Sequence, residues 1–314
     1  MGEFLELLAL PPFRRALFAL AATGIAFPAL GTFILTLELI PARFAVMHAS
    51  LLGAALGLFL GLPPLPAALA ASLVAGLGVA RLSEKGSASA GGSLGLVMTL
   101  SLGLAFILFY KAEVNAIEAF DLFWGSVLAL SQVELYLTCA GAALILGLTL
   151  LFFREIRAVL YDRELAAVLG IPVRVIYYGL VVLICLGIAL AMKVTGALMV
   201  DAVTILPALA ARSLRKNLRG TLLWGAVFGL LMNYGGFALA ILLDLPTSPA
   251  IIVTGSILVF VSHWRSRGLP EKTRRDAYIP SGALDLNHVG PGEYKGGLSP
   301  LGPQQAHDHG QRDG

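Results

Sequence analysis

Residues 173–192 read VRVIYYGLVVLICLGIALAM, and this stretch decides the fold class of the chain. It carries a single charged residue, Arg174, close to its beginning. A helix of about 20 mostly apolar residues has the length needed to cross the hydrocarbon core of a bilayer. The core offers no water to open backbone groups, so a spanning segment of this kind satisfies them within a helix. We therefore expect a transmembrane helix here.

Other apolar stretches along the chain have the same character. They lie at 16–38, 44–61, 65–80, 93–110, 116–132, 136–153, 196–211, 220–243 and 247–264. Three of these, 65–80, 116–132 and 196–211, are short, and they are compatible with tilted, re-entrant or half-helices. The sequence therefore predicts an all-α, polytopic integral membrane protein with about eight to ten spans.

The composition of the whole chain agrees with this fold class. Of its 314 residues, 58% are hydrophobic and 13% are charged, and the mean hydropathy is +0.85. A soluble protein of this size has no core that could bury so much apolar side chain. A soluble globular enzyme, a disordered protein and a disulfide scaffold are thereby excluded. The net charge of +3 is too small and too dispersed to indicate a nucleic-acid partner.

Basic residues in short loops indicate the cytoplasmic side. The loops at 154–174 and 212–219 are both rich in arginine, and the flank after residue 264 agrees with them. The C-terminus is therefore expected in the cytoplasm. If all ten stretches cross, Arg14 and Arg15 also lie inside, but the loop at 81–92 then lies outside with Arg81 and Lys85. The charge rule thus leaves open whether one early segment fails to cross.

Residues 154–172 are amphipathic, in contrast to the apolar stretches around them. Asp162 is placed to cap a short helix that begins near Arg163, and Gly170 with Pro172 would end that helix. Two interpretations remain open for this segment. It is either a docking element on the cytoplasmic face or an interfacial helix that lies on the lipid headgroups.

The chain changes character again after residue 265. Residues 266–314 are rich in glycine and proline and show no apolar periodicity, which predicts a flexible cytoplasmic tail behind a permease domain of residues 1–265. The tail contains His288, His307 and His309. These histidines could bind a metal ion, or they could belong to a solvated tail.

Few polar residues fall inside the apolar stretches, and an ionisable group there is a candidate functional residue. Glu38, His48 and Asp201 carry the carboxylate and imidazole groups that bind divalent transition metals. Structural roles are open alternatives. Glu38 could pair with Arg43, and His48 could donate a hydrogen bond to a nearby carbonyl. Asp201 could hold two helices together.

Gly53, Gly57 and Gly61 recur at every fourth position of the second apolar stretch. Such a row allows another helix to approach closely, and we interpret it as a packing face. A thin pore wall, along which backbones slide, is the functional alternative.

Motifs for hydrolytic chemistry are absent from the sequence. It contains no G-x-x-x-x-G-K-[ST] nucleotide loop, no G-x-S-x-G elbow and no H-E-x-x-H pair. We therefore expect a transport protein rather than an enzyme. If ATP drives the transport, a separate subunit must bind the nucleotide.

Five motifs occur in the order of a known family. They are Gly31-Thr32-Phe33, His48 to Gly53, Tyr161 to Pro172, Gly196 to Ala208, and Asp244 to Val253. On these motifs the chain resembles, over about residues 16–264, the permease subunits of bacterial ATP-binding-cassette importers for zinc, manganese and iron. Asp201 lies where many members have a neutral residue.

The resemblance implies a type II importer permease in the bacterial inner membrane. Such permeases form homodimers, bind two ATPase subunits from the cytoplasm and receive the metal from an extracytoplasmic binding protein. Segment 161–171 then corresponds to the coupling helix, in which Asp162, Arg163, Glu164, Leu165 and Gly170 would serve ATPase coupling. The divalent metal is the cargo, so no permanently bound cofactor is expected. A secondary metal transporter or channel that works without an ATPase is the alternative.

Overall fold

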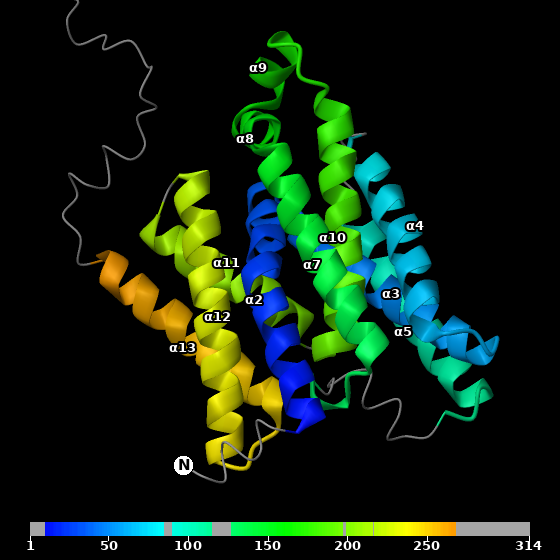
Figure 1. Ribbon diagram of the computed structural model, residues 1–314. Coiled ribbons are helices and arrows are strands. Elements are labelled where there is room, and N and C mark those ends of the chain that lie inside the picture. Colours follow the sequence, from blue (N-terminus) through cyan, green and yellow to red (C-terminus); the bar gives the residue numbers. More distant parts are fainter. Residues whose placement is uncertain (1–9, 85–89, 115–126, 197–198, 216, 268–314) are drawn as a thin grey trace, which may run out of the picture. The chain divides into compact units, whose positions relative to one another are not determined.

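The computed structural model describes residues 10–84, 90–114, 127–196, 199–215 and 217–267, all within the first of two compact units, Met1–Pro270. In these residues the regular structure is helical throughout, as predicted (Figure 1). The elements are α2 (Pro11–Thr36), α3 (Ile40–Phe59), α4 (Pro64–Glu84), α5 (Ala90–Lys111), the 3₁₀ turn η1 (Val127–Ala129), α7 (Gln132–Leu151), α8 (Phe153–Tyr161), α9 (Arg163–Val168), α10 (Val173–Thr195), α11 (Val200–Leu214), α12 (Leu218–Leu242) and α13 (Thr247–Arg267). The predicted tail lies outside the described residues beyond Arg267.

Eight helices of the described ranges are long and apolar enough to cross a membrane. They are α2, α3, α4, α5, α7, α10, α12 and α13. The short stretch at 196–211 forms α11, which has 15 residues. At about 1.5 Å per residue it is shorter than the roughly 30 Å hydrocarbon core, as expected of a half-helix. The lower end of the predicted range of spans is confirmed.

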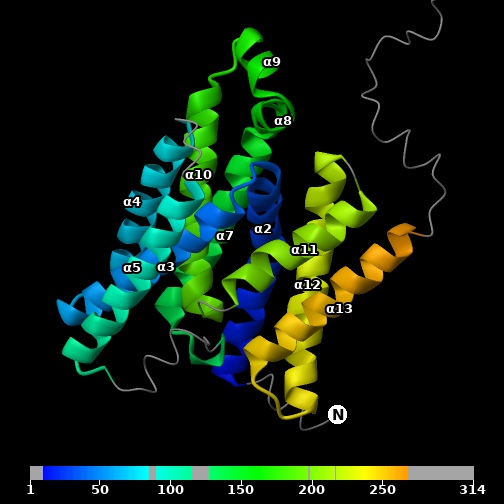
Figure 2. The ribbon, with the colours of Figure 1, turned by 180° about the vertical axis from the view of Figure 1, so that it is seen from behind.

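Helix α2 lies in the middle of the other helices in both views (Figures 1 and 2). It contacts α7, α11 and α12, and most of its residues after the first two turns are apolar and buried. Phe27, Leu30 and Phe33 are completely buried along it. Helices α3, α4 and α5 pack together on one side of α2, and α11, α12 and α13 pack together on the other.

Small residues allow the backbones of α2, α11 and α12 to come very close. A Cβ atom added to Gly31 of α2 would overlap the carbonyl oxygen of Thr204 in α11. A Cβ atom added to Gly229 of α12 would likewise overlap the carbonyl oxygen of Gly24 in α2. Near the second crossing, the Asn233 amide nitrogen donates a hydrogen bond of 2.8 Å to the Leu20 carbonyl. Close backbone approach and a buried hydrogen bond are the contacts that hold helices together in lipid.

The described helices bear on the conflict in the charge rule. Helix α5 ends and α7 begins at the same end of the helix bundle, the lower end in Figure 1. Most of the stretch at 116–132 lies outside the described residues, so its assignment as a span stays a prediction. Helix α4, with Arg81 in its last turn, ends at the same end of the bundle as α8 and α9. Helix α2, which begins with Arg14 and Arg15 in its first turns, starts at the opposite end of the bundle from α8 and α9, in contrast to the arrangement expected if all ten stretches crossed.

Candidate translocation residues and docking helix

Asp201 lies in the first turn of α11, directly after a break in the helical path. Helix α10 ends at Thr195, the next residue, Gly196, has a φ of 81° in the left-handed region, and α11 begins at Val200. The partial positive charge of a helix N-terminus favours a carboxylate at this position. Thr204, one turn later, bonds through its hydroxyl to the Val200 carbonyl at 2.7 Å. The break thus places a carboxylate at the start of a short helix inside the bundle.

The partner of Asp201 is Arg43 of α3. The Arg43 Nη1 atom forms an ion pair with Asp201 Oδ1, and the exposed fractions of the two side chains are 4% and 32%. The suggested pairing of Glu38 with Arg43 is therefore wrong. Glu38 follows α2 in the short link to α3, where it is exposed and has a φ of 57°. The structure instead supports the alternative in which Asp201 connects two helices.

His48 is half-buried on α3, one turn after Phe44. Its Nδ1 atom lies 2.7 Å from the Phe44 carbonyl oxygen. This confirms the predicted hydrogen bond to a nearby carbonyl. The same bond fixes the ring and leaves Nε2 as the nitrogen that could bind a metal ion. A structural and a metal-binding role for His48 are therefore compatible.

The three candidate metal ligands do not form a closed site within one chain. Among the described residues no group of three or more His, Cys, Asp or Glu side chains is arranged to hold a metal ion. Glu38 lies in the link between α2 and α3, His48 lies within α3, and Asp201 begins α11. Their predicted role as transient ligands along a path stays a prediction.

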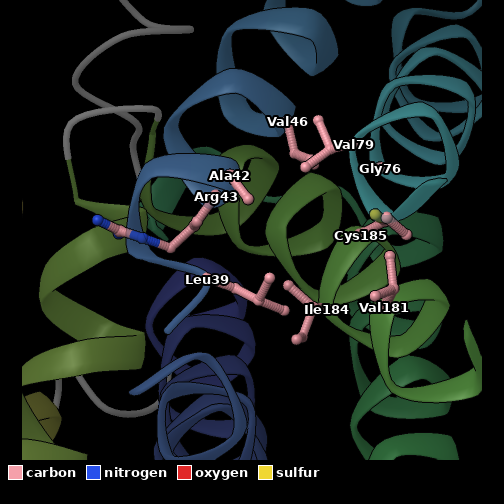
Figure 3. A pocket seen from close by; sticks show the side chains of 10 residues that line it. Leu39, Ala42, Arg43, Val46, Gly76, Val79, Val181, Ile184 and Cys185 are labelled. Atoms are coloured by element: carbon pink, nitrogen blue, oxygen red, sulfur yellow. The ribbon is translucent and has the colours of Figure 1, made fainter. Parts of the chain in front are cut away.

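A small apolar pocket lies between α3, α4 and α10, next to the ion pair (Figure 3). Val46, Val79 and Ile184 line it together with the buried thiol of Cys185. Arg43 also borders the pocket, but its guanidinium points away from the other labelled side chains. The pocket therefore lacks the oxygen and nitrogen ligands that a hard or borderline cation needs.

The amphipathic segment forms two short helices, α8 and α9, at one end of the bundle (Figure 1). Asp162 separates them and caps α9, since its Oδ1 atom accepts hydrogen bonds from the backbone N–H groups of Glu164 and Leu165 at 2.9 and 3.0 Å. Gly170 has a φ of 79° after α9 ends. The predicted cap and the predicted stop are confirmed.

The surface of α9 suits a protein partner. The side chains of Leu165, Val168 and Leu169 are 52%, 84% and 67% exposed, respectively. Within α9 only Ala166 is buried. Arg163 packs its guanidinium over the ring of Tyr177 in α10, 4.6 Å from the ring centroid. An apolar patch beside charged residues at the tip of a membrane protein is typical of an interaction site.

The predicted glycine row is correct for two of its three members. Gly53 and Gly57 of α3 face α4, where an added Cβ of Gly53 would lie 3.0 Å from the Ala67 carbonyl carbon and that of Gly57 3.0 Å from Ala67 Cβ. Gly61 does not share this face. It follows the end of α3 at Phe59 and has a φ of 68°, and no atom in the described ranges lies within 4 Å of an added Cβ. A turn residue was thus mistaken for a packing residue.

Two features of the site were missed in the sequence. Arg43 was considered only as a partner of nearby Glu38, although a charge four residues into an apolar helix needs a partner inside the bundle. The contact of Gly31 with the Thr204 backbone was missed because one sequence does not show which helices touch. The positions of Arg43 and Asp201 in otherwise apolar stretches were the available signal for the ion pair.

Comparison with known proteins supports this architecture. Residues 10–266 match the family model of the ABC 3 transport family. The chain is 24% identical to the manganese transport system membrane protein MntC of Halalkalibacterium halodurans, over 85% of this chain and 96% of that protein. It is 25% identical to the high-affinity zinc uptake system membrane protein ZnuB of Haemophilus influenzae, over 76% and 92% of the two chains.

Solved structures show the same fold. One chain of PsaBC from Streptococcus pneumoniae, solved in complex with a Fab, superposes with a TM-score of 0.78 at 24% identity, covering 87% of this chain and 99% of that one. A metal-chelate type ABC transporter in an inward-facing conformation gives 0.61 at 19% identity, covering 80% and 85%. The chain is thus a multi-pass membrane subunit of a transport system rather than an enzyme, and it belongs to the ABC 3 transport family.

Proposed function

We propose that the chain is the membrane-spanning subunit of an ATP-driven importer for a divalent metal ion, namely zinc, manganese or iron. The observation that carries this proposal is the family match, because it covers residues 10–266 and hence all eight candidate spans. Relatives named for manganese transport and zinc uptake cover most of the same length. The cargo is a transported substrate, and the chain holds no resident cofactor in this proposal.

In the proposed assembly, two copies of the chain form the pore in the bacterial inner membrane. Two ATPase subunits bind from the cytoplasm, and an extracytoplasmic binding protein delivers the metal. The exposed apolar side chains of α9 support docking of an ATPase at this end of the bundle. The proposal places the C-terminus in the cytoplasm, which the direction of α13 toward the same end supports (Figure 1).

Closure of the ATPase dimer on ATP would displace α9 sideways. Helix α9 contacts α8 and α10, and α8 contacts α7, so the displacement reaches α10 directly and α7 through α8. ATP can shift the equilibrium between outward-open and inward-open states only by its difference in affinity for them. The chain therefore needs only a firm connection between α9 and the spans, and it needs no nucleotide site of its own.

Glu38, His48 and Asp201 would serve as successive, transient metal ligands. Imidazole nitrogen and carboxylate oxygen suit zinc, manganese and iron. A path must also release its ion, so a few ligands spread along it are more suitable than a closed coordination shell. The absence of a three-ligand group among the described residues is compatible with this requirement.

Charge reversal of Glu164 tests the docking helix. Glu164 is exposed, and the Asp162 cap binds its backbone N–H rather than its side chain, so Glu164→Arg leaves the fold of α9 intact. If Glu164 faces the ATPase, we expect metal uptake and stimulated ATPase activity to fall about 30-fold, which corresponds to an interface contact of about 2 kcal/mol. Uptake of radioactive manganese or zinc by cells and ATP hydrolysis by the purified complex measure these effects.

Glu113→Arg is the matched control for this variant. Glu113 is an exposed glutamate just after α5, at the opposite end of the bundle from α9. Because Glu113 lies away from the proposed ATPase interface, Glu113→Arg should leave ATP hydrolysis by the purified complex unchanged. Normal uptake by Glu164→Arg would show that the coupling assignment is wrong. If ATP depletion leaves uptake intact and no ATPase copurifies, the secondary-transporter alternative is correct.

Removal of the His48 imidazole tests the metal path. The ring is already oriented by the Phe44 carbonyl, so His48→Ala removes an oriented nitrogen ligand. We expect kcat/KM for manganese or zinc uptake to decrease about tenfold, the effect of about 1.4 kcal/mol. His263→Ala, at an exposed histidine near the end of α13, is the control and should transport normally. Wild-type uptake by His48→Ala would remove this residue from the path.

A further inference from the structure

Arg43 is a buried cation whose counter-charge, within the described residues, is the Asp201 carboxylate. Its side chain is 4% exposed, and its Nε atom has no hydrogen-bond partner in the part of the chain that the structure describes. The guanidinium also lies over the ring of Phe44, 4.4 Å from the centroid. A buried arginine with incompletely satisfied nitrogens is costly unless a counter-charge stays close. Contact between α3 and the start of α11 is therefore tied to the charge of Asp201.

Asp201, in contrast, is open on one side. Its Oδ1 atom is buried against Arg43, yet the side chain as a whole is 32% exposed. A mobile cation can thus approach the carboxylate without first unpacking the helices. Phe44 connects this pair to His48, because its ring lies under Arg43 and its carbonyl binds His48 Nδ1. A candidate metal ligand and the ion pair are therefore linked through one residue.

We propose that Arg43 occupies the cation position on Asp201 when no cargo is present, and that the transported metal ion displaces it. The inference rests on the proposed function and adds a latch to it, formed by Arg43 on α3 and Asp201 on α11. A doubly charged ion competes with the guanidinium for the same carboxylate. Once displaced, Arg43 loses its counter-charge, so the first turn of α3, which carries Arg43, moves away from α11. Cargo binding is thereby coupled to separation of the two helices.

Direct metal binding provides the first test. In the wild-type chain only molecules with an open latch can bind the metal. The apparent affinity for metal is therefore the intrinsic affinity multiplied by the fraction of molecules with the latch open. Arg43→Gln removes the competitor, so we expect the purified full-length chain in nanodiscs to bind Mn²⁺ about tenfold more tightly, as for a latch that is closed in about 90% of molecules. The loss of the free Mn²⁺ signal in electron paramagnetic resonance measures this affinity.

Three variants complete the binding test. The double variant Arg43→Gln, Asp201→Asn should not show the gain in Mn²⁺ affinity, because the carboxylate that binds the metal is missing. Arg81→Gln, at an exposed arginine in the last turn of α4, should bind like the wild type. Arg43→Met, similar in length but uncharged, replaces Arg43→Gln if that variant misfolds. Unchanged Mn²⁺ affinity in the folded Arg43 variant, or a gain that persists without Asp201, would overturn the proposal.

A distance measurement distinguishes a latch from a fixed ion pair. Spin labels on cysteines at Ile40 and Leu209, both partly exposed, report the separation of α3 and α11 in a Cys139→Ser, Cys185→Ala background. Diamagnetic Zn²⁺ should lengthen the distance in the wild-type sequence. Arg43→Gln should show the longer distance without metal. A distance that Zn²⁺ leaves unchanged would overturn the latch, whereas absence of cellular metal uptake by the wild type would overturn the proposed function instead.

Discussion

Asp201→Asn is expected to lower the free energy of unfolding by about 3 kcal/mol, near the lower end of the range measured when one partner of a buried ion pair is removed. The reason is the burial of Arg43, which is 4% exposed and would keep its charge without a carboxylate beside it. Arg43→Gln should cost less, because the remaining Asp201 is 32% exposed and retains some contact with its surroundings. The loss of stability in each variant is measured by heating the detergent-purified chain and determining the fraction that remains monodisperse.

The double variant makes this expectation specific to the pair. Replacement of both partners removes the buried charge together with its counter-charge, so the combination of Asp201→Asn with Arg43→Gln should recover most of the lost stability. Asp244→Asn is the matched control, since Asp244 is exposed and has a φ of 51°, a conformation that asparagine adopts readily. If Asp201→Asn and Asp244→Asn unfold at the same temperature, Asp201 is not the stabilising counter-charge of Arg43.

Gly31→Ala is expected to be the second strongly destabilising change, at about 3 kcal/mol, the upper end of the usual cost of overpacking. The added methyl group would overlap the carbonyl oxygen of Thr204, and a backbone atom cannot rotate away as a side chain can. Helices α2 and α11 would have to separate. The expected result is a lower unfolding temperature together with reduced transport, since the start of α11 carries Asp201.

Gly103→Ala is the matched control for the close helix contact. Gly103 also lies within a long apolar helix, α5, but an added Cβ there meets no atom of the described residues within 4 Å. Alanine is the better helix former by roughly 1 kcal/mol, so this variant should be neutral or slightly stabilising. Equal unfolding temperatures for the two alanine variants would show that α2 and α11 are not in close contact at Gly31.

The spans and the capped helix could be predicted because both depend on local sequence. A run such as 173–192 specifies a spanning helix by length and apolarity alone. Asp162 caps α9 through the backbone of the residues that directly follow it, so the cap could be predicted as well. The stretch at 116–132 lies mostly outside the described residues, so its assignment as a span stays a prediction.

Contacts between distant residues could not be predicted in the same way. Within lipid, apolar side chains gain little from facing one helix rather than another, so the sequence of a span carries little information about its neighbours. Proximity in the sequence therefore suggested Glu38 as a possible partner of Arg43, whereas its partner Asp201 lies on α11. Gly61 continued the spacing of Gly53 and Gly57, but α3 ends before it. In both cases the role of the residue depends on its contacts in the folded chain, which the local sequence does not specify.

The Asp162 cap has a mechanical consequence for the transport cycle. Two backbone N–H groups of α9 are bound by one carboxylate, so its first turn resists fraying when it is pushed. A loose segment in the same place would absorb an applied force as local bending. A stiff α9 instead passes a sideways force to α10, against which Arg163 is packed through Tyr177. The work of ATP binding would then appear as tilting of whole helices rather than as melting of a loop.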